Sequence, residues 1–202
     1  MTRQLWITTL TLAMLVSHAP GATAQQRRRP ASPPGMSATQ IGTDWIEIEY
    51  GRPILRGRAD IFGSGPEFGT TINDGAPAWR AGANHSTRLR TDVALEIGGQ
   101  RVPPGEHVLI VELSSEREWT LIVTDQPYQR TYDPSNTTEL WGAFNYKPDW
   151  DVARAPMTVE TLPYSVDQLT WTFTDVSPAG GTLRVTWARM MGSFSFKVLP
   201  TS

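Results

Sequence analysis

The chain has no cysteine and almost no net charge, and each absence excludes a class of protein. Without cysteine there is no disulfide, no thiolate metal site, no cysteine nucleophile and no acylated cysteine of the lipoprotein type. A net charge of -2 over 202 residues also lacks the basic surplus that contacts with nucleic-acid phosphates require. We therefore expect neither a lipid tether nor a nucleic-acid partner.

Enzyme signatures are missing as well. The chain contains no G-x-S-x-G elbow, no H-E-x-x-H helix and no phosphate-binding loop. Beyond the N-terminal region the only histidines are His85 and His107, which lie on different expected elements and lack metal-ligand spacing. The sequence therefore predicts no metal and no cofactor, and it favours a non-catalytic protein.

The first residues have the composition of a secretory signal peptide. A basic residue, Arg3, precedes an apolar run over residues 5–16, and small residues follow up to Ala24. Threonines interrupt the run, which is shorter than the roughly 20 apolar residues needed to span a bilayer. We expect cleavage after Ala24, which makes residues 1–24 a signal peptide and the mature chain an exported bacterial protein, periplasmic or secreted, without stable membrane insertion.

The rest of the chain divides by composition into a spacer and one domain. Residues 25–38 are rich in Gln, Pro and Ser and include the basic run 27–29, a composition typical of a flexible, solvated segment. The length that remains suits one ordinary domain, which buries enough surface to fold without a covalent staple. We therefore predict a spacer at 25–38 and a single domain at 39–202.

Apolar and polar residues alternate in this domain with a period of two, as they do in strands that cover a core. In residues 44–50, for example, Ile46, Ile48 and Tyr50 alternate with glutamates. The pair Gly98-Gly99 is typical of a tight hairpin. We predict an all-β fold with very little helix: a single antiparallel β-sandwich, jelly-roll-like or a partly open barrel. The expected strands are residues 44–50, 88–97, 107–113, 119–124, 157–162, 168–176, 182–188 and 193–199.

Two connections, residues 51–83 and 125–155, are longer than most loops in compact domains, so we expect a site there. The first carries several arginines, whose planar guanidinium groups suit carboxylate, phosphate or sulfate. This predicts a pocket for a small polar or anionic ligand, with Trp79 and Phe62 as walls and the turn at Gly82 as floor. The candidate ligand-binding residues are Arg52, Arg58, Trp79, Arg80, Asn84 and His85, and Arg56 belongs to the same cluster.

A structural role for the arginines is the alternative. Arg58 and Arg80 would then pair with carboxylates, because charge near a core is seldom left unpaired. The available carboxylates include Asp60, Asp92 and Glu96. Such pairs would pin the long first loop to the domain and would leave no pocket for a ligand.

The second connection is crowded with aromatic residues accompanied by amides and carboxylates. Flat rings beside polar groups can hold sugar faces or fill the centre of a protein interface. Alternatively, a long loop over an open end of the sheet buries its own rings as a satellite cluster. The residues concerned are Tyr128, Tyr132, Trp141, Phe144, Tyr146 and Trp150, together with Asn136, Asn145, Asp149 and Asp151.

Several motifs resemble those of one bacterial family. They are Gly51-Arg52-Pro53, Arg56-Gly57-Arg58, Ile61-Phe62-Gly63, Trp79-Arg80-Ala81-Gly82-Ala83-Asn84, Pro104-Gly105-Glu106-His107, Glu118-Trp119-Thr120 and Asp151-Val152-Ala153-Arg154. Over about residues 36–199 the chain resembles the DUF2911 family of exported proteins. The resemblance implies export and fold but no activity, because the family's function is undefined. Members usually have Glu at the position of His85 and a shorter loop before the Trp.

Three functions remain open from the sequence. The first is a non-catalytic exported module that binds a small polar or anionic ligand in its strand-end loops. The second is a hydrolase that works through His85 and a nearby carboxylate, which requires a histidine within hydrogen-bonding reach of Asp or Glu in a pocket. The third is an envelope protein-interaction module with residues 141–150 as its contact patch.

Overall fold

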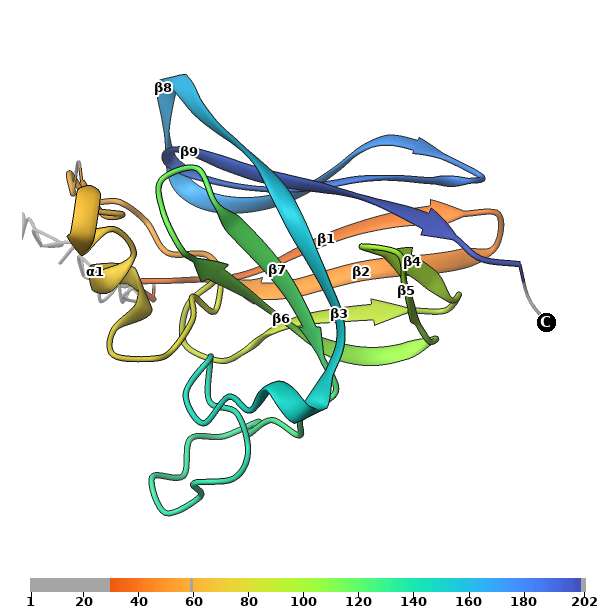
Figure 1. Cartoon of the computed structure of the whole chain (residues 1–202), viewed down its shortest axis with the longest axis horizontal. Coiled ribbons are helices and arrows are strands. Elements are labelled where there is room, and N and C mark those ends of the chain that lie inside the picture. The colour runs from red at the N-terminus through yellow and green to blue at the C-terminus, as the bar shows by residue number, and fades with distance from the viewer. Residues whose placement is uncertain (1–29, 59, 201–202) are drawn as a thin grey trace, which may run out of the picture.

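The computed structural model describes residues 30–58 and 60–200 (Figure 1). The expected signal peptide, its cleavage site and residues 25–29 of the expected spacer lie outside the described residues. The strands are β1 (Pro34–Ile41), β2 (Asp44–Gly51), β3 (Thr87–Thr91), β4 (Leu95–Ile97), β5 (Gln100–Val102), β6 (Gly105–Leu113), β7 (Trp119–Thr124), β8 (Asp151–Ser177) and β9 (Gly180–Val198). The helical elements are one short helix, α1 (Thr70–Asn73), and two single 3-10 turns, η1 (Gly65–Glu67) and η2 (Pro148–Trp150).

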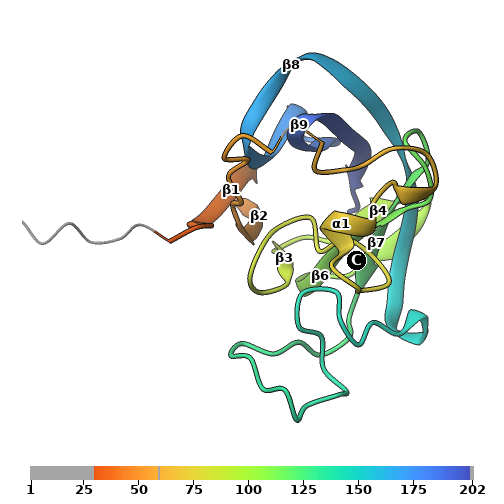
Figure 2. The same cartoon turned by 90° about the vertical axis from the view of Figure 1, so that its left-hand side faces the viewer.

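All nine strands form one antiparallel sheet in the order β1-β2-β3-β6-β7-β8-β9-β4-β5. The sheet curls around a single core without closing: β8 starts as the neighbour of β7, and its later part and β9 lie across the core from β3 and β6 (Figure 2). This confirms the predicted all-β antiparallel class with very little helix, in the form of a partly open barrel. No helix in the described ranges is both long and apolar enough to span a bilayer.

The core follows from the alternation along the strands. On β2, Ile46, Ile48 and Tyr50 point inward and are at most 2% exposed, as predicted. The glycine pair also behaves as predicted, because Ile97 pairs with Gln100 across a two-residue turn. Both glycines of that turn have positive φ, 60° and 78°, which glycine adopts without steric cost.

Some predicted strand boundaries are wrong. The expected strand 88–97 is two strands, because the chain turns after Thr91, whose Oγ1 accepts a hydrogen bond from the Val93 amide at 3.3 Å. Before the turn, β3 pairs with β6, whereas after it β4 pairs with β9. The four strands expected after residue 156 are continuous parts of two long strands, β8 and β9.

Strand β1 is not predicted by the sequence pattern. It pairs with β2 along its whole length, and the predicted start of the domain at residue 39 falls inside it. The residues of β1 alternate between exposed and half-buried, and none is fully buried. An edge strand of this kind has no strong apolar alternation. The Gln-, Pro- and Ser-rich composition of residues 25–38 therefore predicts a spacer where the structure has part of β1.

Candidate ligand-binding site

A cavity of about 1100 Å³ lies between the two long loops. One wall comes from residues 52–86, which include α1, and the other from residues 125–150. Figure 2 shows the first loop across the open end of the curled sheet, with the second loop below it. The cavity also reaches Ser32 on the N-terminal side of β1 and Trp187 on β9. The two connections expected to hold separate sites therefore enclose one cavity.

The start of the first loop is fastened to the free edge of β8. The Leu55 amide donates to the Asp167 carbonyl at 2.8 Å, and the Leu169 amide donates to the Pro53 carbonyl at 3.1 Å. Arg58 closes the turn that follows, because its Nε and Nη2 donate to the carbonyls of Leu55 and Ile54 at 3.0 and 2.9 Å. This arginine is therefore largely engaged by the main chain.

The run Trp79-Arg80-Ala81-Gly82-Ala83-Asn84 forms the innermost part of the first loop. Trp79 bridges to β6 through two main-chain hydrogen bonds of 2.8 Å with Val111. The Ala81 carbonyl is buried and accepts the Trp171 indole N–H at 2.9 Å. Because Trp79 and Ala81 lie in the core, the alternate residue Arg80 lines the cavity. Successive side chains of this run therefore alternate between the core and the cavity, and the Arg80 guanidinium lies on the cavity side.

Arg80 has few partners for a half-buried cation. Its Nη1 donates to the Asn84 carbonyl at 2.7 Å, and its guanidinium lies 5.6 Å from the ring centroid of Phe144. Among the described residues no carboxylate lies within 4.0 Å of it. Burial lowers the pKa of Arg80, and Asp74 at a longer distance opposes this. Arginine stays protonated in proteins, so the cavity contains a cation without a close counter-ion.

Arg56 is the second cavity arginine with free donors. It is exposed, lines the cavity, and makes no hydrogen bond or ion pair with the described part of the chain. Its φ of 52° lies in the left-handed region. The cavity also contains acidic side chains, Asp74 and Asp133, and hydrogen bonds from Ser135 lower the pKa of Asp133. The charge of the cavity is therefore mixed, with the cations on the first loop.

The wall formed by the second loop is aromatic and amidic. Tyr132 and Trp141 lie with ring centroids 5.2 Å apart, and Tyr132 is 57% exposed. Asn136 and Asn145 line the same wall. The side chain of Asn145 donates to the main-chain carbonyls of Asn136 and Glu139 at 3.2 and 3.1 Å, which holds the loop in its fold. The sequence predicts these rings as a separate site and does not show that they line the same cavity as the arginines.

Buried polar groups fasten this second loop to the sheet. Gln126 is 2% exposed; its Nε2 donates to the carbonyls of Thr138 and Asn145 at 2.9 and 2.7 Å, and its Oε1 accepts the Lys147 amide at 2.8 Å. At the start of the loop, Asp125 pairs with the buried His107 of β6. Hydrogen bonds within the loop and its contacts with the sheet therefore hold it in place as one wall of the cavity.

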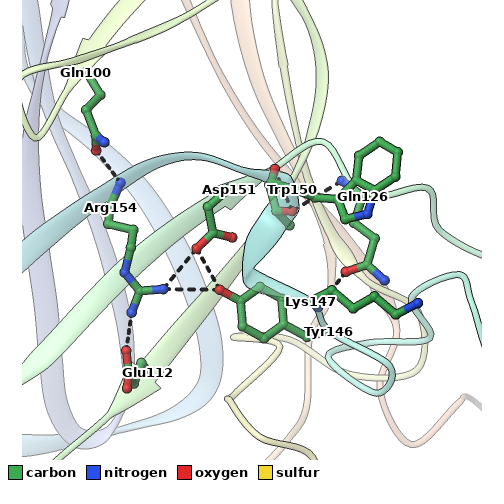
Figure 3. A network of polar contacts seen from close by, with 9 residues as sticks. Gln100, Glu112, Gln126, Tyr146, Lys147, Trp150, Asp151 and Arg154 are labelled. Carbon is green, nitrogen blue, oxygen red and sulfur yellow. Dashed lines mark hydrogen bonds and ion pairs between the residues drawn. The ribbon is translucent and has the colours of Figure 1, made fainter.

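The end of the second loop is held by the network in Figure 3. Tyr146 donates to the Asp151 carboxylate at 2.7 Å, and Arg154 donates to Tyr146 and Asp151 at 3.1 and 2.9 Å. Arg154 also pairs with Glu112 of β6. Burial, followed by the hydrogen bond to Asp151, raises the pKa of Tyr146 well above 10. The motif at 151–154 therefore joins the loop to the sheet.

We expect the stabilising effect of Tyr146 to disappear in alkali. Its folded-state pKa is raised above the unfolded value of 10, so its contribution is present below pH 10 and is lost as the pH rises through the folded pKa. Urea unfolding should show wild type more stable than Tyr146→Phe below about pH 9, with the difference shrinking above pH 10. The exposed Tyr164 supplies a control, Tyr164→Phe, which removes a hydroxyl outside the network and should change stability little. A difference that grows with pH would contradict the assignment.

The structure brings most of the predicted site residues together. Arg58, Trp79, Arg80 and Asn84 line the cavity, although Trp79 is only 2% exposed. Arg52 is not a lining residue, because its guanidinium reaches the Leu169 carbonyl and the Thr170 hydroxyl of β8, both at 3.4 Å. His85 lines a different, smaller groove beside β1 and β2.

Phe62 and the expected acidic partners differ from the prediction. Phe62 is a core residue, 4% exposed and stacked on Trp119 at 5.4 Å, so it does not line the cavity. Asp92 accepts the Trp45 amide at 3.0 Å, and Glu96 pairs with Lys197 at 2.7 Å. Pairing of the loop arginines with these two carboxylates is therefore wrong. Arg52 and Arg58 do fasten the first loop, through carbonyl and hydroxyl oxygens instead.

The aromatic residues of the second loop divide into two groups. Tyr128, Phe144 and Tyr146 pack against a satellite cluster that includes Ile110 and Ile122 on the outer face of the sheet. The satellite interpretation thus holds for these three. The other three are not in that cluster: Tyr132 and Trp141 line the cavity, as Phe144 also does, and Trp150 is 47% exposed outside it.

Comparison with known proteins identifies a family for this chain but no activity. Residues 32–196 match the model of the family described as protein of unknown function (DUF2911). No curated protein and no solved structure matches the chain. The match spans all nine strands except the last residues of β9, and it includes both loops that enclose the cavity.

Proposed function

The chain belongs to the DUF2911 family, whose function is unknown, and from its cavity we propose that it is an exported, non-catalytic module that binds a small polar anion between its two long loops. Export rests on the N-terminal sequence, and a mature protein that starts at Gln25 by mass spectrometry would support it. A full-length mature chain would contradict it.

The proposal rests on the unused hydrogen-bond donors of Arg80. A guanidinium has five N–H donors, and the described residues use one of them, for the Asn84 carbonyl. A partly buried cation without a close carboxylate is costly, and an anionic ligand would offset that cost with charge-assisted hydrogen bonds. Arg56 adds a second set of free donors on the same wall.

The construction of the walls supports a binding role. Both loops are fastened by hydrogen bonds to the sheet or within themselves, through Arg58 on one side and Gln126 on the other. A ligand that enters such a cavity orders few groups, so less of its interaction energy is lost to conformational entropy. The acidic groups Asp74 and Asp133 disfavour a polyanion and favour a ligand with one negative group and a polar body.

The hydrolase hypothesis has no support from a histidine in this cavity. The His85 Nδ1 lies 2.9 Å from the Ser86 carbonyl, and no carboxylate of the described residues is among its hydrogen-bond partners. His107 does pair with Asp125, but it is 3% exposed, and its Nε2 is occupied by the Pro103 carbonyl at 2.9 Å. A general base needs access to its substrate, so binding is the function that the geometry favours.

We expect Arg80→Gln to weaken anion binding at least tenfold. Thermal unfolding and calorimetry with acetate, citrate, phosphate and glucuronate should show at least one anion that stabilises wild type and binds the variant at least tenfold more weakly, as for loss of a charged hydrogen bond. The control is Arg90→Gln, because Arg90 is exposed and paired with Glu47 at 3.8 Å on the sheet surface. It should bind like wild type.

A second pair of variants separates binding from stability. A Cβ on Gly142 would lie 2.7 Å from the Arg80 guanidinium, whereas a Cβ on Gly42 would meet nothing within 4 Å, and both glycines have φ near 65°. Both alanine variants should lose about 1 kcal/mol of stability, but only Gly142→Ala should lose anion binding. If no anion in the panel binds wild type while Arg80→Gln unfolds readily, Arg80 only holds the loop and the proposal fails.

A further inference from the structure

Aromatic rings and the Arg80 guanidinium come together at one turn of the second loop. Residues 141–144 close a turn in which the Phe144 amide donates to the Trp141 carbonyl at 3.0 Å. Arg80 lies over the Phe144 ring and against Gly142 in the middle of that turn. Trp141, at its start, lies beside Tyr132 and lines the same cavity. Two aromatic rings, tilted by 43° to each other, and a cation therefore line one cavity.

The two rings at the cavity differ in burial from the tryptophans of the core. Trp79, Trp119 and Trp171 are each at most 2% exposed, because they fill the core. Tyr132 is 57% exposed and Trp141 is half-buried, and both line the cavity. Accessible aromatic rings that line a cavity are a typical contact surface for a ligand.

Neutral hydrogen-bonding groups line the same cavity. Thr71 and Thr137 contribute hydroxyls, and Asn84 contributes an amide whose Oδ1 receives no hydrogen bond from the described residues. Such groups suit a ligand with many hydroxyls, since each can donate to one hydroxyl and accept from another. The cavity of about 1100 Å³ slightly exceeds the usual range for small-molecule sites, which leaves room for more than one ring.

We propose that the ligand is an acidic saccharide, one or two sugar rings with a carboxylate. A ring face lies against Trp141 and Tyr132, while the carboxylate binds the donors of Arg80 and Arg56 and the hydroxyls meet the amides and threonines. This inference rests on the proposed function, because it names the ligand class of the same cavity. A single carboxylate also agrees with the acidic groups nearby, which disfavour a more highly charged ligand.

Calorimetry of the mature protein with defined sugars tests this. We expect D-glucuronate or a uronate disaccharide to bind wild type at least tenfold more tightly than D-glucose or acetate. Trp141→Ala should lose at least tenfold for the uronate and little for acetate, whereas Arg80→Gln should reduce the uronate to the level of glucose. Trp150→Ala is the matched control, because Trp150 belongs to the same loop, is 47% exposed and does not line the cavity.

The outcomes separate the two proposals. If acetate and phosphate bind as tightly as uronates and Trp141→Ala changes nothing, the saccharide is wrong and anion binding stands. If glucose 6-phosphate binds more tightly than glucuronate, the carboxylate is wrong and the charged group is a phosphate. If none of these compounds binds wild type, both proposals fail.

Discussion

Replacement of Trp171 by alanine is expected to lower the free energy of unfolding by about 4 kcal/mol, near the upper end for core truncations. Trp171 on β8 is 0% exposed and joins three parts of the chain. Its amide donates to the Tyr50 hydroxyl of β2 at 3.1 Å, and its indole donates to the Ala81 carbonyl of the first loop at 2.9 Å. The variant therefore leaves a large void and also releases the turn beside Arg80.

Two further variants show how much of this loss in stability comes from the indole hydrogen bond and how much from burial of the ring. Trp171→Phe keeps most of the ring but leaves the Ala81 carbonyl with only the Thr87 hydroxyl at 3.3 Å, so we expect a loss of about 2 kcal/mol. Trp45→Ala, at a tryptophan that is 44% exposed, should change stability by less than about 1 kcal/mol. Urea unfolding measures all three. Equal losses for Trp171→Ala and Trp45→Ala would contradict the placement of Trp171 at the centre of the fold.

The second large effect is expected at the β4–β5 hairpin. Gly98→Ala should cost about 3 kcal/mol, whereas Gly99→Ala should cost about 1 kcal/mol. Both glycines have positive φ, so both variants carry a left-handed strain. Only at Gly98 would the new Cβ lie 2.3 Å from a main-chain oxygen, that of Arg154, while at Gly99 it would meet nothing within 4 Å.

The contact of this hairpin with β8 explains why the difference should be large. The Gln100 side chain accepts the Arg154 amide at 2.7 Å (Figure 3), so the hairpin is held to β8 at the same residue whose carbonyl faces Gly98. The main chain of β8 at Arg154 cannot move away from the new Cβ as a flexible side chain can. Chemical unfolding of the two variants measures the difference, and equal losses would show that the hairpin does not press against β8 in solution.

The candidate site was accessible to sequence reasoning only in part. Arg58, Trp79, Arg80 and Asn84 were predicted, because arginines in long loops indicate anion binding. Arg52 was assigned to the same site, but it bonds to β8, about 117 residues further along the chain. Tyr132 and Trp141 were assigned to a separate site, because their loop is distant in sequence from the arginines.

The sequence by itself determined the residues that face the core, because the period of two places alternate side chains of a strand on one face. That pattern determined the all-β class, the hairpin at Gly98-Gly99 and the two loops that lack it. Only the tertiary structure decided which strands are neighbours, that the sheet curls without closing, and that the two loops enclose one cavity. Those features depend on pairing between residues far apart in the chain, such as Leu55 with Asp167, which local alternation does not encode.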